Sequence, residues 1–326
     1  MWNKKTKDRL LKLLILAGAW ALVWYQFSRS QDKNDVLEML ISIPREKLIY
    51  LFSILLLMLL NWTIEAVKWK YLAGKLQPFG FWKALRSVIS GVSIGMFTPN
   101  RTGEFAGRIV YLRHENRAEG AVLSMIGSFS QFFTTIFVGI PALILYLLVF
   151  SHEGVISGRL SISVMLSVAT SLVLMILYFR LDLVYKFLRR FSRIEKQKEK
   201  IRHLKTTSRR DLLLLLGLSI LRYSVFILQF YLICIMFGLN IAFWQVFLGA
   251  ANLYFLMSLL PVFTLGEPGL RGSLTGIFFQ AFTMQIAGII SASVLLWIIN
   301  VLLVALAGAI FLLTQKILNY ESKTSS

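Results

Sequence analysis

The sequence is poor in the residues from which soluble enzymes build their sites. It has one cysteine, three histidines and 16 acidic residues in a chain of 326. Cys234 alone allows neither an internal disulfide nor a cysteine metal cluster, and the histidines lack the spacing of metal ligands. Charged residues make up 16% of the chain, whereas soluble domains carry about 25%. These shortages argue against almost any soluble enzyme, and we expect no metal and no cofactor.

Hydrophobic residues, by contrast, make up 57% of the chain, and the mean hydropathy is +0.69. Because about 20 apolar residues cross a bilayer as a helix, the sequence predicts an all-α polytopic membrane protein. About six full transmembrane helices are expected, at 10–27, 48–64, 121–150, 160–179, 212–237 and within 272–315. Two further apolar segments, 84–98 and 243–260, are short and end at Pro99 and Pro261. Such segments predict re-entrant or broken helical hairpins.

The basic residues indicate how the chain is oriented. The formal net charge is +19, and Lys and Arg concentrate in cytoplasmic loops. We therefore expect a multi-pass inner or plasma membrane protein with both termini in the cytoplasm. The predicted division is an N-terminal anchor helix and outer loop (1–47), a first membrane repeat (48–180), a basic cytoplasmic loop (181–210), a second membrane repeat (211–315) and a cytoplasmic tail (316–326). The basic loop is a topology signal or attracts anionic lipids, so nucleic acid is not an expected partner.

An internal repeat relates the two short segments. Pro261 follows Phe243-Trp244 at the distance at which Pro99 follows Phe81-Trp82. The shared pattern is F-W, then P-x-x-T-(x)-G-E-x-x-x-R. The first copy supplies Pro99, Thr102, Gly103, Glu104 and Arg108, and the second supplies Pro261, Thr264, Gly266, Glu267 and Arg271. Since the predicted topology gives the copies opposite orientations, we expect an inverted repeat with its site between the copies.

The repeated residues have a structural and a functional interpretation. Thr102 and Thr264 can each cap a helix that follows the proline turn, and Thr264-x-x-Glu267 fits a capping box. Glutamate and arginine lie four positions apart in both copies, so each pair shares a helix face. In the structural interpretation each glutamate only caps its helix and pairs with its arginine. In the functional one, a helix N-terminus and an arginine bind an anionic group such as phosphate.

Other charged residues lie within or beside apolar runs. Arg222 is expected to face a cavity or a carboxylate partner, because ionisable residues at membrane depth mark functional sites. Glu65 and Lys68, at the end of the second predicted span, are expected to lie at the membrane interface. The spacings Gly91-x-x-x-Gly95 and Gly272-x-x-x-Gly276 favour close helix packing.

The segment from Gly91 to Arg108 resembles a signature of the transmembrane region of lysylphosphatidylglycerol synthases. The segment from Pro261 to Gly269 is similar to the second signature of that family, and the resemblance covers about residues 45–315. It implies a flippase-like membrane domain whose functional positions match Arg101, Glu104, Arg108 and Glu267. The soluble domain that transfers lysine is not expected here, because the membrane region accounts for the chain. Relatives that are attached to glycosyltransferases imply a lipid or lipid-linked substrate.

Three hypotheses follow. The first is a translocator that moves an anionic phospholipid or a polyprenyl-phosphate-linked lipid between leaflets and is not an enzyme. The second is an accessory membrane subunit of a lipid-modifying or glycosyltransferase partner. The third is a membrane-embedded lipid-modifying enzyme, although no nucleophile–base pair is evident; a small-solute transporter also remains open. The predicted substrate-binding residues are Arg101, Glu104, Arg108, Arg222, Glu267 and Arg271.

Overall fold

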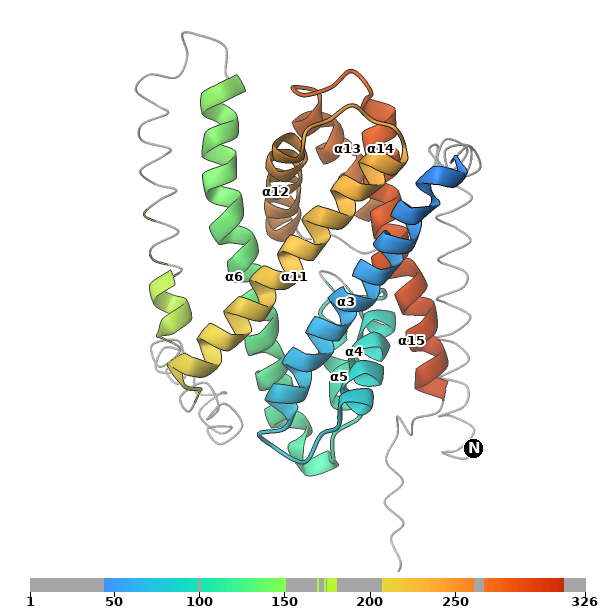
Figure 1. Ribbon diagram of the computed structural model, residues 1–326. Helices are drawn as coiled ribbons and strands as arrows, with labels where there is room; N and C mark the ends of the chain where they lie inside the picture. The colour runs from blue at the N-terminus through green and yellow to red at the C-terminus, as the bar shows by residue number, and fades with distance from the viewer. Residues whose placement is uncertain are drawn as a thin grey trace, which may run out of the picture.

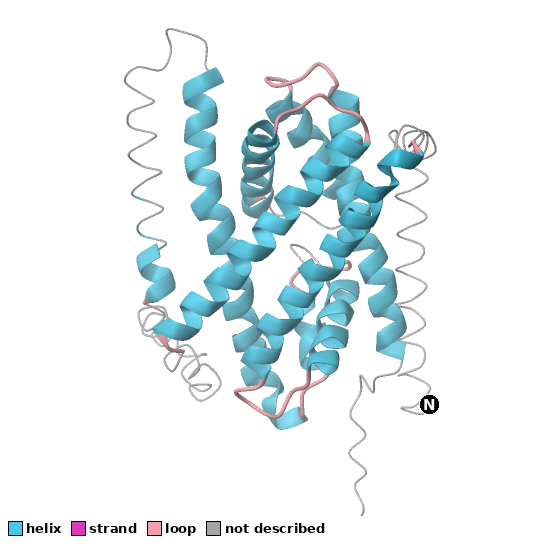
Figure 2. Ribbon diagram, in the orientation of Figure 1, coloured by secondary structure: helices cyan, strands magenta, loops and turns pink. Residues whose placement is uncertain are grey.

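The protein is described by a computed structural model that covers residues 44–98, 101–150, 169, 173, 175–180, 207–260 and 267–313. Within these residues the secondary structure is helical, and Figure 2 shows helices joined by short loops. Four helical stretches are long and apolar enough to cross a membrane: 45–73, 114–150, 209–236 and 286–313. The predicted all-α polytopic membrane fold is therefore confirmed. The predicted span 10–27 lies outside the described residues, and so does most of 160–179.

The long helices form the frame of the bundle (Figure 1). They are α3 (Leu48–Ala73), which follows the short η1 (Arg45–Lys47), then α6 (Arg117–Phe150) and α11 (Arg209–Met236). The last stretch comprises α14 (Ile286–Trp297), the π-helical turn η3 (Ile298–Leu302) and α15 (Leu303–Leu313). Helix α3 continues nine residues beyond the predicted span, because its charged residues pair inside the protein, as shown below.

Two pairs of shorter helices fill the frame from opposite ends. The first pair is α4 (Phe81–Gly95) and α5 (Glu104–Ile109), followed by η2 (His114–Asn116); the second is α12 (Phe243–Leu259) and α13 (Glu267–Phe279). In Figure 1 the α4–α5 hairpin lies in the lower half of the bundle, and α12 and α13 lie in the upper half. At 1.5 Å per residue, none of these four helices reaches across a hydrocarbon core of about 30 Å. Each pair therefore enters from its own side.

Small residues let the first hairpin close tightly. A Cβ atom added to Gly107 of α5 would lie 2.4 Å from the Cα atom of Gly91 of α4, so the two backbones are in direct contact. The packing predicted from Gly91 and Gly95 is thus confirmed. Around Gly272 and Gly276 the packing is looser, since an added Cβ would meet α14 side chains only at 3.5 Å or more.

The start of α5 differs from the prediction. The helix begins at Glu104, with Gly103 at the N-cap position and no side-chain cap, so Thr102 is not the capping residue. The hydroxyl that holds this turn belongs to Thr98, whose Oγ1 accepts a hydrogen bond of 2.7 Å from the Gly103 N–H. It can do so because Thr98 lies beside the start of α5, where its carbonyl also accepts a hydrogen bond of 3.2 Å from the Arg101 N–H. Pro99 and the segment 261–266, with Pro261, Thr264 and Gly266, lie outside the described residues, as does the predicted capping box.

Candidate substrate cavity between the two hairpins

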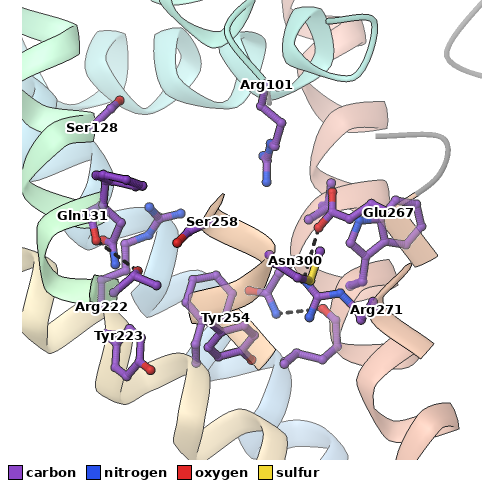
Figure 3. A pocket seen from close by; sticks show the side chains of 17 residues that line it. Arg101, Ser128, Gln131, Arg222, Tyr223, Tyr254, Ser258, Glu267, Arg271 and Asn300 are labelled. Atoms are coloured by element: carbon purple, nitrogen blue, oxygen red, sulfur yellow. Dashed lines mark hydrogen bonds and ion pairs between the residues drawn. The ribbon is translucent and has the colours of Figure 1, made fainter. Parts of the chain in front are cut away.

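A cavity of about 520 Å³ lies between the two hairpins (Figure 3). Its walls come from α6, α11, α12, α13, the end of α14 and the π-helical turn, and Arg101 of the first hairpin completes them. Arg222 lies near the middle of α11, and Asn300 lies near the middle of the last span, so the cavity is deep within the bundle. The polar residues that line it are Arg101, Ser128, Gln131, Thr135, Arg222, Tyr223, Tyr254, Ser258, Glu267, Arg271 and Asn300.

In the first hairpin, Glu104 is held between two arginines. Its Oε1 lies 2.7 Å from Nε of Arg101, and its Oε2 lies 3.2 Å from Nη2 of Arg108. The predicted pairing four positions apart is confirmed. Arg101 has a φ of 56°, in the left-handed region that residues other than glycine seldom adopt. In Figure 3 its side chain extends from the hairpin into the cavity.

The second hairpin repeats this arrangement. Nη2 of Arg271 lies 3.1 Å from Oε1 of Glu267, again four positions away and again at the start of a helix. Here the arginine and the glutamate both line the cavity. The guanidinium also lies over the ring of Tyr254, 5.7 Å from its centroid. The two copies of the motif thus present arginine–glutamate pairs to the same region from opposite hairpins.

Glu65 of α3 joins the first hairpin to α11. Its Oε1 lies 2.9 Å from Nη1 of Arg108, and its Oε2 lies 3.1 Å from Nη1 of Arg222. The ammonium of Lys68 lies 2.9 Å from the same Oε2. Glu65 and Lys68 are each only 1% exposed. The sequence predicts them at the membrane interface; the structure places both side chains inside the bundle, where three cations surround this carboxylate and make its burial tolerable.

Arg222 has both of the environments that the sequence suggested, a cavity and a carboxylate. Beyond its pair with Glu65, its Nε donates a 2.8 Å hydrogen bond to Oδ1 of Asn61, and its guanidinium lies over the rings of Trp62 and Phe226. Asn61 in turn donates from Nδ2 to Oδ1 of Asn300 at 3.1 Å. Asn300 belongs to the π-helical turn, and such turns often occur at functional sites.

The structure therefore divides the predicted residues into those that line the cavity and those that support it. Arg101, Arg222, Glu267 and Arg271 line the cavity, while Glu104 and Arg108 stand behind it and hold Arg101 and Glu65. Sequence reasoning missed Asn61, which supports the site, and seven polar residues that line it: Ser128, Gln131, Thr135, Tyr223, Tyr254, Ser258 and Asn300. Asn61 and Asn300 are 1% exposed or less. Polar amides inside long apolar runs are the signal that could have identified them.

The chemistry of the cavity is that of an anion site. Three arginines and one glutamate line it, so positive charge predominates. Arginine presents several N–H donors in a planar fork that matches the oxygens of phosphate or carboxylate. Such cations at this depth in a membrane protein are costly without an anionic partner. An anionic group is therefore the ligand that the wall suits best.

The comparison with protein families agrees with the sequence signatures. The family model described as the lysylphosphatidylglycerol synthase TM region matches residues 9–312. No match was found among curated proteins or among solved structures. Because the matched region is most of the chain, this protein is an integral membrane protein that belongs to the lysylphosphatidylglycerol synthase transmembrane-region family.

Proposed function

We propose that this protein moves a lipid with an anionic phosphate headgroup, either a phospholipid or a polyprenyl-phosphate-linked lipid, between the two leaflets. The observation that carries the proposal is the cavity wall, in which Arg101 from one hairpin faces Arg271 and Glu267 from the other. A headgroup crossing a bilayer needs polar partners throughout the hydrocarbon region. Arginines that reach the middle of the bundle from both ends would supply them.

The geometry supports a mechanism based on exchange of ion-pair partners. Each cavity arginine is already paired with a carboxylate: Arg101 with Glu104, Arg222 with Glu65 and Arg271 with Glu267. A phosphate that enters would share these guanidinium donors, and the carboxylates would take them back when it leaves. Neither state leaves an arginine unpaired in a region of low dielectric constant. The acyl or prenyl chains would stay in the bilayer.

The test is lipid translocation by the purified full-length chain in liposomes. Fluorescent phosphatidylglycerol is compared with fluorescent phosphatidylethanolamine, for the wild type, Glu104→Gln and Glu267→Gln. Loss of either carboxylate leaves its arginine without an exchange partner, and we expect translocation to fall about tenfold or more. Glu46→Gln, which removes an exposed carboxylate outside the cavity, is the matched control and should be unchanged.

Movement by the wild type that both cavity variants lose would support translocation. Fluorescent phosphatidic acid is tested in the same way, and if correctly folded wild type moves none of the three lipids faster than protein-free liposomes do, this proposal is rejected. The accessory role beside a lipid-modifying or glycosyltransferase partner would then be the better account. If Glu46→Gln loses as much activity as Glu267→Gln, the cavity is not the path.

A further inference from the structure

The charges around the cavity discriminate between classes of phosphate. Four charged residues line it, and four more are joined to these by ion pairs of 3.2 Å or less. The combined set contains five cations, Arg101, Arg108, Arg222, Arg271 and Lys68, and three carboxylates, Glu65, Glu104 and Glu267. Among the described residues of this network, two positive charges are therefore not balanced.

Most of this network is buried, and Arg101, with a side chain that is 27% exposed, is its most exposed member. Glu65, Lys68 and Arg108 are each 3% exposed or less, and Arg271 is 8% exposed. Charge removed from water is costly unless an opposite charge compensates it. A ligand that carries two negative charges compensates the network, whereas a ligand with one leaves a cation in excess.

Unpaired donors in the wall lead to the same conclusion. The hydroxyl of Tyr223 and the Nε of Arg271 are buried, belong to residues that line the cavity, and have no hydrogen-bond partner in the structure. Buried donors without partners are unusual and call for an explanation. A ligand rich in acceptor oxygens would satisfy them. A phosphomonoester offers three terminal oxygens, one more than a phosphodiester.

We propose that the cavity selects lipids whose phosphate is a monoester over lipids whose phosphate is a diester. A phosphomonoester carries about −1.5 to −2 charge at neutral pH, and a phosphodiester carries one negative charge. Polyprenyl phosphates and phosphatidic acid belong to the favoured class, and phosphatidylglycerol to the other. The inference rests on the proposed function for the identity of the ligand as a lipid, but it concerns binding and can be measured without transport.

The experiment is calorimetric titration of the detergent-solubilised full chain with short-chain probes. Dihexanoyl phosphatidic acid is the monoester, and dihexanoyl phosphatidylglycerol is the diester. One additional charge near several buried cations predicts binding about tenfold tighter for the monoester. Equal binding, or tighter binding of the diester, overturns the inference. A third titration uses glycerol 3-phosphate, which has the headgroup without acyl chains. If it binds as tightly as the lipid monoester, the ligand is a soluble phosphate and not a lipid.

Two variants at one position isolate the role of charge. Gln131 lines the cavity and its Oε1 has no partner, so Gln131→Glu adds one negative charge with almost no change of shape. We expect this variant to lose most of the preference for the monoester. Gln131→Leu, similar in size and uncharged, should keep that preference. If both variants keep it, the charge surplus does not set selectivity.

A substitute variant and the comparison with the liposome assay complete the test. Where Gln131→Glu fails to fold, Arg271→Gln removes one positive charge instead and should reduce the preference in the same direction. Selective binding together with no movement in liposomes would reject translocation and leave this inference standing. Movement in liposomes without selective binding would support translocation and overturn this inference.

Discussion

Glu65→Gln is the substitution for which the structure gives the most definite expectation. The change keeps the size of the side chain and removes one charge from a position that contacts Lys68, Arg108 and Arg222 at 2.9, 2.9 and 3.1 Å. Removing one partner of a buried ion pair costs about 3–5 kcal/mol, because the remaining charge is left uncompensated. Each cation keeps at least one other contact, to Ser219, Glu104 and Asn61 respectively. We therefore expect Glu65→Gln to lower the free energy of unfolding by an amount near the lower end of that range.

The assay is equilibrium or thermal unfolding of the detergent-solubilised chain, followed by tryptophan fluorescence. Glu104→Gln is the matched comparison, because the Glu104 side chain is 16% exposed and that of Glu65 only 2%. We expect Glu104→Gln to lower the free energy of unfolding by less than half as much, since Arg101 is 27% exposed and screened by water, and Arg108 keeps its pair with Glu65. The double variant Glu65→Gln/Lys68→Met removes one charge of each sign and should recover part of the loss. If Glu65→Gln destabilises no more than Glu104→Gln, the buried network does not hold the bundle together.

Two further expectations concern packing and topology. Gly107→Ala places a Cβ atom 2.4 Å from the backbone of α4 and should destabilise the protein by roughly 1–3 kcal/mol in the same unfolding assay. Gly217→Ala is the control, because nothing lies within 4 Å of the added Cβ atom, and it should not lower the free energy of unfolding. On a Cys234→Ser background, exposed cysteines at Pro78 and Asn240 should react with a membrane-impermeant thiol reagent from opposite sides of the membrane, and labelling from the same side would contradict the opposed hairpins.

The sequence was informative wherever an interaction is local. The pairs Glu104–Arg108 and Glu267–Arg271 follow from helical periodicity once a helix is expected there, and both form. The two short apolar segments were recognised by length and by the prolines that follow them. Composition alone led to a helical membrane fold, because 57% hydrophobic residues leave few alternatives.

Long-range interactions could not be read in the same way. Glu65 and Arg222 are 157 positions apart, and no spacing rule relates them. Glu65 was assigned to the interface because it follows directly on an apolar run, and only the placement of α5 and α11 shows that it is buried. The link from Asn61 to Asn300 has the same origin, and the π-helical turn that carries Asn300 left no signal in the sequence.

The central claim is that a lipid headgroup passes through the cavity between the hairpins, and blocking the cavity tests it most directly. Ser258 lines the cavity, and Ser224 lies on the exposed face of α11. On a Cys234→Ser background, a cysteine at either position is reacted with a bulky thiol reagent, and lipid translocation is then measured in liposomes. We predict that modification at position 258 stops translocation and that modification at position 224 leaves it unchanged. Undiminished translocation after complete modification at position 258 would contradict the account.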